Sequence, residues 1–133
     1  MKILLAEDSK EMAAILQSIL KRNYDGLHIV WEDDGEKALQ EFRTCHKLIS
    51  AGLDPEYDCV ITDKQMPIRN GVSLAEEIKN IQRFVPIFLW TAGLLSIPPH
   101  KAALFRGIVG KDDHGFWVED VFKEIYEKAH TVS

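Results

Sequence analysis

Five short apolar runs, separated by stretches with helical periodicity, constrain the fold of this chain more than any other feature. The runs read KILLA, LHIVW, CVIT, IFLW and RGIVG, and they cover residues 2–6, 27–31, 59–62, 87–90 and 106–110. Short runs this rich in apolar residues are typical of parallel strands that are buried on both faces. Because parallel strands are joined by crossover segments of one hand, we expect an open parallel sheet with helices on both faces.

The segments between the runs carry apolar residues at the spacing of helices. Ser9 can cap the first helix, and Asp34-Gly35 leads into the second. Asn70-Gly71 opens the third helix, and the last begins at Phe116. The residues expected to face the sheet are Met12, Ile15, Leu16, Ile19 and Leu20, then Ala38, Leu39, Phe42, Cys45 and Ile49, then Leu74, Ile78 and Ile81, and finally Val118, Val121, Phe122, Ile125 and Ala129.

Two adjacent prolines limit the fourth helical segment. Proline fits only in the first turn of a helix, so Pro98-Pro99 predicts a short helix over Pro99–Phe105. The chain has 133 residues, and five alternations of strand and helix leave none for a second unit. We therefore expect one domain over residues 1–133.

The composition argues against several classes of partner. A formal net charge of −5 offers no basic surface for nucleic acid or for an anionic membrane. No apolar stretch approaches the length of a membrane span, and no signal segment precedes the first run. Cys45 and Cys59 form no CxxC motif and are expected to be small buried residues. We expect a cytoplasmic protein that binds neither nucleic acid nor a membrane directly.

Polar side chains follow four of the apolar runs at the point where each run ends. Glu7 and Asp8 follow the first run, and Asp63 follows the third. Thr91 and Lys111 follow the fourth and fifth. Because ligands of open parallel sheets bind in the crevice beyond the carboxyl ends of the strands, we expect three acids, a hydroxyl and an ammonium to meet there.

These residues suit phosphoryl transfer assisted by a divalent cation. An ionised aspartate such as Asp63 acts as a nucleophile without a general base. Like charges near 4 Å repel by about 4 kcal/mol at an effective dielectric of about 20, so Glu7 and Asp8 oppose an incoming phosphoryl anion. A bound Mg²⁺ ion turns this repulsion into attraction, and it prefers the oxygen ligands that the acids supply. The pattern therefore predicts a magnesium site in the crevice.

The order and placement of these motifs resemble the receiver domain of bacterial response regulators over nearly the whole chain. The matching motifs are Glu7-Asp8, Asp63 followed by Met66-Pro67 and Asn70-Gly71, Thr91-Ala92, and Lys111. The resemblance implies an α/β fold of the flavodoxin-like, doubly wound type, with five helices and a five-stranded parallel sheet of order 2-1-3-4-5. It also implies a stand-alone, chemotaxis-regulator-like protein of two-component signalling.

The same resemblance implies a role for each site residue. Asp63 is the expected phosphoacceptor, and Mg²⁺ is expected to be held by Glu7 (through a bound water), Asp8, Asp63 and the backbone carbonyl of Gln65. The residues expected to contact the phosphoryl oxygens are Thr91, Ala92 and Lys111. The protein is expected to assist its own phosphorylation and dephosphorylation, and it is not expected to be an enzyme that turns over other substrates.

The resemblance also implies partners. The expected donor is a phosphohistidine on a sensor histidine kinase or on a histidine phosphotransfer protein. The phosphorylated protein is expected to signal to an unidentified downstream protein through direct contacts or a phosphorelay. Either a monomer or a phosphorylation-dependent dimer is compatible with this interpretation.

Two positions depart from the pattern of the family and keep a second interpretation open. Ile108 stands where a switching Tyr or Phe is usual, and Asp112 stands where proline usually follows the lysine, so we expect a trans bond after Lys111. The alternative is a receiver-fold module that binds proteins without regulation by phosphorylation.

A small doubly wound enzyme fits the sequence less well. A haloacid-dehalogenase-type phosphatase needs DxD after the first strand, where this chain has Asp8-Ser9-Lys10. In a flavodoxin-like carrier, Glu7 and Asp8 would repel the flavin phosphate.

Overall fold

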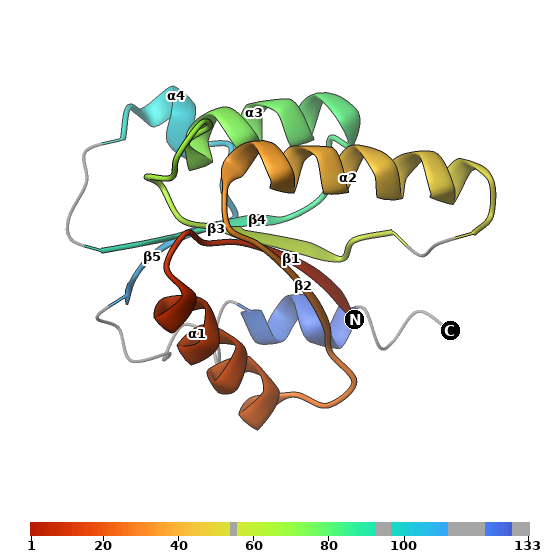
Figure 1. Ribbon diagram of the computed structural model, residues 1–133, viewed down its shortest axis with the longest axis horizontal. Helices are drawn as coiled ribbons and strands as arrows, with labels where there is room; N and C mark the ends of the chain where they lie inside the picture. Colours follow the sequence, from red (N-terminus) through yellow and green to blue (C-terminus); the bar gives the residue numbers. More distant parts are fainter. Residues whose placement is uncertain (54–55, 93–96, 112–121, 129–133) are drawn as a thin grey trace.

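One sheet of five parallel strands forms the centre of the computed structural model, which describes residues 1–53, 56–92, 97–111 and 122–128. The strands are β1 (Lys2–Ala6), β2 (His28–Glu32), β3 (Cys59–Thr62), β4 (Ile87–Thr91) and β5 (Gly107–Gly110). Their spatial order is β2-β1-β3-β4-β5, and every neighbouring pair is parallel (Figure 1). The predicted fold class and strand order are confirmed.

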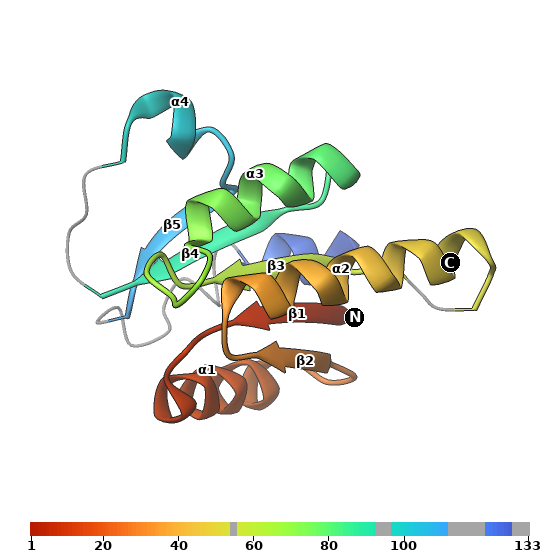
Figure 2. The same cartoon turned by 45° about the horizontal axis from the view of Figure 1, so that its top comes forward.

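Helices cover both faces of the sheet. They are α1 (Lys10–Asn23), α2 (Gly35–Ser50), α3 (Gly71–Ile81) and α4 (Pro99–Ala102), and residues 122–128 are also helical. In both ribbon views α2 and α3 lie side by side (Figures 1 and 2), and Figure 1 shows them on one face of the sheet with α1 and the 122–128 helix on the other. Among the described residues, no helix combines the length and the apolar character that crossing a bilayer requires.

Side-chain caps explain where three of the helices begin. The side chains of Ser9, Asp34 and Asn70 each accept a hydrogen bond from the backbone N–H three residues further on, at 3.3, 2.7 and 2.8 Å. Each cap satisfies one of the backbone N–H groups that the first turn of a helix leaves without a partner. Because the three caps follow the ends of β1, β2 and β3, they start these helices beside the crevice.

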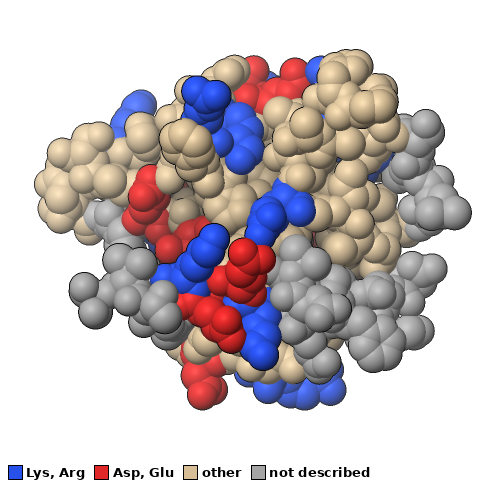
Figure 3. Space-filling view, turned by 180° about the vertical axis from the view of Figure 1, so that it is seen from behind, with Lys and Arg blue, Asp and Glu red and all other residues tan. Residues whose placement is uncertain are grey.

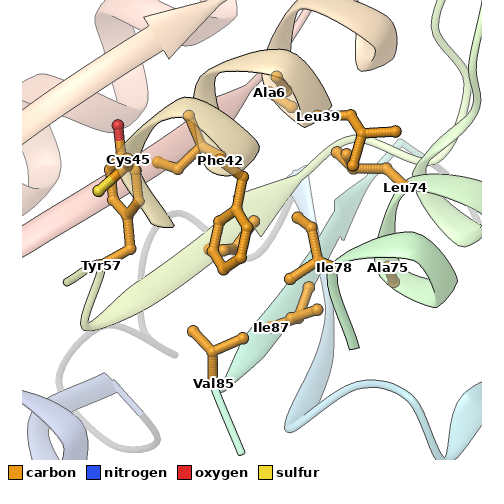
Figure 4. Close-up of a cluster of buried hydrophobic side chains, with 13 residues drawn as sticks. Ala6, Leu39, Phe42, Cys45, Tyr57, Leu74, Ala75, Ile78, Val85 and Ile87 are labelled. Atoms are coloured by element: carbon orange, nitrogen blue, oxygen red, sulfur yellow. The ribbon is translucent and has the colours of Figure 1, made fainter. Parts of the chain in front are cut away.

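Two clusters of buried side chains fill the space between the sheet and the helices. The cluster on the side of α1 and the 122–128 helix includes Phe88 and Phe122. The cluster under α2 and α3 includes Phe42 and Tyr57, whose rings stack with centroids 5.9 Å apart (Figure 4). Burying one large apolar side chain stabilises the fold by about 1.5–3 kcal/mol, so these clusters supply much of the stability.

The predicted inward face of α1 was wrong at one position. Ile15 is 48% exposed, whereas Ala13, Leu16 and Leu20 are buried. At about 100° per residue, Ile15 lies well away from the arc that these three residues occupy, although it shares their apolar character.

The short helix after Pro98 ends earlier than predicted. It stops at Ala102, not at Phe105, because the N–H of Arg106 already pairs with Ile87 O in the sheet at 2.8 Å. The intervening residues form a turn in which the N–H of Phe105 bonds to Ala102 O at 3.1 Å. The predicted start of the last helix at Phe116 lies outside the described residues, as do Val118, Val121 and Ala129.

Charged side chains of both signs intermingle on the face that Figure 3 presents. Ion pairs between described residues include Lys101–Glu76 at 2.8 Å and Arg106–Glu124 at 2.7 Å. Exposed pairs of this kind stabilise a fold by at most about 1 kcal/mol each. The two buried clusters therefore contribute more to the stability than these exposed pairs do.

Candidate functional site

Main-chain hydrogen bonds place the predicted acids at the carboxyl edge of the central strands. Ala6 of β1 is paired with Thr62 of β3, so Glu7 and Asp63 follow neighbouring strand ends. The N–H of Asp63 donates to Ala6 O at 2.9 Å, and the N–H of Glu7 donates to Glu32 O at 3.1 Å. The sheet therefore fixes the backbone on which both carboxylates stand.

The three acids meet as expected. One carboxylate oxygen from each of Glu7, Asp8 and Asp63 lies within 4.8 Å of the others. Glu7 is fully buried and Asp63 is 8% exposed, whereas Asp8 faces solvent. A cluster of three carboxylate oxygens that remains open on one side matches the ligands that Mg²⁺ prefers, because this ion keeps several waters. The residues present therefore fit a magnesium ion.

Lys111 lies among these acids. Its Nζ forms an ion pair with Glu7 and lies 3.2 Å from Asp63 Oδ2. The ammonium also lies 5.0 Å from the centre of the Trp90 ring, and the lysine side chain is 12% exposed. The ammonium thus lies beside two of the three acids and offsets only part of the charge that they carry when ionised.

Burial and pairing shift the protonation of this cluster. Burial raises the pKa of Glu7 to about 7, against the lowering effect of Lys111 and of the Ser9 N–H, which donates to Glu7 Oε2 at 3.0 Å. Burial lowers the pKa of Lys111, but its contacts with Glu7 and Asp63 outweigh this effect and hold the pKa above the ordinary value. The lysine therefore stays charged at neutral pH.

The remaining predicted residues lie around the cluster. Thr91 is buried at the end of β4, next to β3, and Ala92 follows it as an exposed residue. Gln65 is exposed in the segment after Asp63. Within the described residues the Thr91 hydroxyl makes no hydrogen bond to the acids. The fold thus brings Thr91 to the same edge as Asp63 without joining the two side chains.

Two contacts at the site were not predicted. The indole N–H of Trp31 donates to the carbonyl oxygen of Glu7 at 2.7 Å and holds the chain just beyond β1. Arg69 contacts Glu36 of α2, which ties the segment after Asp63 to a neighbouring helix. The sequence gives no indication of either contact, because neither the tryptophan nor the arginine belongs to a recognisable motif.

Of the two positions that depart from the pattern of the family, only Ile108 lies within the described residues. Ile108 is 45% exposed on the edge strand β5. Asp112, and with it the peptide bond after Lys111, lies outside the described residues. The expected trans bond therefore stays a prediction.

Comparison with known sequences gives a consistent result. The family described as "Response regulator receiver domain" matches residues 3–108. The transcriptional regulatory protein CpxR of Klebsiella pneumoniae is 30% identical over 91 residues, which are 68% of this chain and 33% of that protein. The autoinducer 2 sensor kinase/phosphatase LuxQ of Vibrio harveyi is 32% identical over 93 residues, which are 69% of this chain and 9% of that protein. The chain thus spans a third or less of these two relatives.

Solved structures resemble the fold over most of its length. The response regulator TrrA of Thermotoga maritima, solved with Mg²⁺ and BeF, has a TM-score of 0.77 at 24% identity and covers 93% of this chain and 97% of its own. The receiver domain of the Arabidopsis thaliana histidine kinase CKI1, solved with Mg²⁺ and BeF₃⁻, has a TM-score of 0.78 at 17% identity. It covers 95% of this chain and 89% of its own. At these identities the likeness concerns the fold alone.

Proposed function

The chain belongs to the response regulator receiver domain family, and we propose that in two-component signalling it accepts a phosphoryl group on Asp63. The observation that carries this proposal is the cluster of three carboxylates within 4.8 Å of one another, with the Lys111 ammonium 3.2 Å from Asp63. A cluster of this kind repels a phosphate when it stands alone, and it favours one when cations balance the charge. We infer a single receiver unit over residues 1–133.

Each side chain has a defined part in the proposed transfer. A carboxylate oxygen of Asp63 forms the new bond to phosphorus, while the bond from phosphorus to the donor nitrogen breaks and its electron pair stays on the imidazole. The ammonium of Lys111 offsets charge on a phosphoryl oxygen as a compact point charge. The Thr91 hydroxyl and the Ala92 N–H donate to the other oxygens.

The residues that would hold Mg²⁺ are Glu7, Asp8, Asp63 and the backbone carbonyl of Gln65. The oxygen donors and the spacing of the three carboxylates support this set. The ion would supply positive charge between the carboxylates and the phosphoryl oxygens. Through the same cluster the chain would assist its own phosphorylation and dephosphorylation.

The proposed donor is a phosphohistidine on a sensor histidine kinase or on a histidine phosphotransfer protein. Membership of the receiver family supports this donor. The phosphorylated chain would then act on a downstream protein in the cytoplasm, through direct contacts or a phosphorelay, as a monomer or a phosphorylation-dependent dimer.

Intact mass measurement tests the proposal. The protein is incubated with acetyl phosphate and Mg²⁺, and we expect a mass gain of one phosphoryl group. Asp63→Asn should abolish the gain, and omission of Mg²⁺ should abolish it in the unchanged chain. Asp33→Asn is the control, because Asp33 is an exposed carboxylate that pairs with Lys37 at 2.9 Å. A wild-type chain that gains no mass from acetyl phosphate or from a phosphohistidine donor would contradict the proposal and favour a binding module instead.

A further inference from the structure

The segment between β3 and α3 packs tightly against its surroundings through two glycines. A Cβ atom on Gly71 would overlap the carbonyl oxygen of Asp63, and one on Gly35 would overlap the carbonyl oxygen of Arg69. Gly35 is the first residue of α2, and Gly71 is the first residue of α3. The backbone that carries Asp63 therefore lies in direct contact with the starts of two helices.

The Arg69 side chain adds a bridge between the same two helices. Its Nε donates to Glu36 Oε2 of α2 at 2.9 Å, and its NH1 group donates to Ser73 Oγ of α3 at 2.7 Å. Hydrogen bonds from Gln40 and Arg69 lower the pKa of Glu36. The Arg69 side chain is 25% exposed, so the bridge is partly shielded from solvent.

The backbone of this segment needs such support. Ile68 has a φ of 70°, in the left-handed region that β-branched residues rarely adopt, and its side chain is 82% exposed. Backbone of this kind persists only where the surrounding structure holds it. No burial of Ile68 compensates for the strain, so the contacts on either side of it must do so. Arg69, the next residue, supplies such contacts through its side chain.

We propose that Arg69 is a positioning residue for the phosphoacceptor site: its bridge from Glu36 to Ser73 holds the 63–70 segment in the geometry that metal and phosphoryl binding require. This inference rests on the proposed function. Arg69 itself touches neither the acids nor Lys111 in any of its hydrogen bonds, and it acts through the backbone between Asp63 and Asn70. A planar guanidinium that reaches two acceptors at once is suited to this role, and a lysine is not.

Arg69→Gln tests the proposal, and Arg43→Gln is a matched control. Arg43 also links α2 to α3, through Glu77 at 3.6 Å, but within the described part of the chain it has no hydrogen bond to the 63–70 segment. Mg²⁺ is added stepwise while intrinsic tryptophan fluorescence is recorded, and phosphoryl uptake from acetyl phosphate is followed by intact mass measurement. We expect Arg69→Gln to weaken Mg²⁺ binding by about tenfold, the lower end of the effect seen when residues that orient metal ligands are removed. Arg43→Gln should leave the affinity unchanged, and Arg69→Lys should give an intermediate loss.

Hydrogen exchange on the metal-free protein gives a readout that does not depend on phosphorylation. The Gly71 N–H donates to Lys64 O at 2.8 Å and the Arg69 N–H donates to Pro67 O at 2.7 Å, so both amides report on the segment. Faster exchange of these amides in Arg69→Gln, with unchanged exchange in the β1 strand, would support the proposal.

Three results would overturn it. Wild-type Mg²⁺ affinity and wild-type exchange in Arg69→Gln would remove the positioning role. Equal losses in Arg69→Gln and Arg43→Gln would indicate general destabilisation. A wild-type chain that binds no Mg²⁺ and takes up no phosphoryl group would remove the proposed function, and the positioning role with it. The wild-type measurement separates this last result from the other two.

Discussion

The ammonium of Lys111 lies 3.2 Å from Asp63 Oδ2 and also pairs with Glu7. In the absence of a metal ion, the lysine is thus the cation that this pair of carboxylates shares. An incoming divalent cation meets acids whose charge is already partly offset. Lys111 should therefore oppose metal binding and favour phosphoryl binding, since the two ligands have opposite charge.

Lys111→Met should separate these two effects. We expect Mg²⁺ binding to become roughly tenfold tighter, or about 1.4 kcal/mol, because one competing positive charge is removed. Phosphoryl uptake should slow by about a hundredfold, as it does when one donor to a developing anion is lost. Fluorescence titration and mass spectrometry measure the two quantities. Lys123→Met, at an exposed lysine on the 122–128 helix, should change neither. Weaker Mg²⁺ binding in Lys111→Met would show that the lysine supports the metal site instead of competing with it.

Gly71→Ala should damage both the fold and the site. The added methyl group would overlap the carbonyl oxygen of Asp63 and lie 3.1 Å from Thr62 Oγ1, and neither atom belongs to a long flexible side chain. Overpacking of this kind costs about 1–3 kcal/mol, which urea denaturation would measure. Phosphoryl uptake should fall as well, because the backbone of Asp63 must shift.

Gly26→Ala is the control for this substitution. Gly26 has a φ of 71° and open space around it, so alanine there is strained without touching the site. We expect a loss of about 1–2 kcal/mol from the left-handed backbone, with phosphoryl uptake unchanged. Normal uptake in Gly71→Ala would mean that the segment can relax around the added methyl group.

Phe42→Ala should destabilise the protein strongly. Phe42 is 2% exposed and stacks on Tyr57 in the cluster under α2 and α3 (Figure 4). Truncation of a buried phenylalanine costs about 3–5 kcal/mol, because transfer and cavity effects add. Phe84→Ala is the comparison, since Phe84 is 87% exposed and should change the free energy of unfolding by no more than about 0.5 kcal/mol. Similar values for the two variants would be incompatible with the packing described.

Both thiols should resist alkylation in the folded protein. Cys45 and Cys59 are buried, and burial raises the pKa of the Cys59 thiol well above its ordinary value. The reactive thiolate of Cys59 is therefore scarce, and burial keeps both sulfur atoms from the reagent. Intact mass after treatment with iodoacetamide should show no adduct in buffer and two adducts in urea. Rapid labelling of Cys59 in buffer would reveal an opening of the sheet at β3.

The fold and the position of the acids could be predicted from the sequence because they depend on short-range patterns. Short apolar runs predict strands, and the polar residues that follow them mark the strand ends. Because parallel strands bring these ends to one edge, Glu7, Asp8 and Asp63 were expected to meet. Ile15 was misplaced because an apolar residue at helical spacing carries no information on how wide the buried face is. The length of α4 depended on a pairing of Arg106 with β4 that no local pattern encodes.

The contacts that hold the site could not be predicted. The hydrogen bond from Trp31 to Glu7 joins residues 24 positions apart, and the bond from Arg69 to Glu36 joins residues 33 positions apart. Both depend on side-chain directions that arise only after the sheet has formed. Arginine and glutamate are common on protein surfaces, so their presence in the sequence does not distinguish a bridge from two solvated charges.

The glycines that begin α2 and α3 leave no room for a side chain between these helices and the 63–70 segment. Gly71 lies against the carbonyl oxygen of Asp63 and Gly35 lies against that of Arg69, whereas the side chain of Ile68 is exposed. A new side chain at Ile68 would thus meet solvent and not the carboxylates, and its main requirement is that the residue accepts the left-handed backbone.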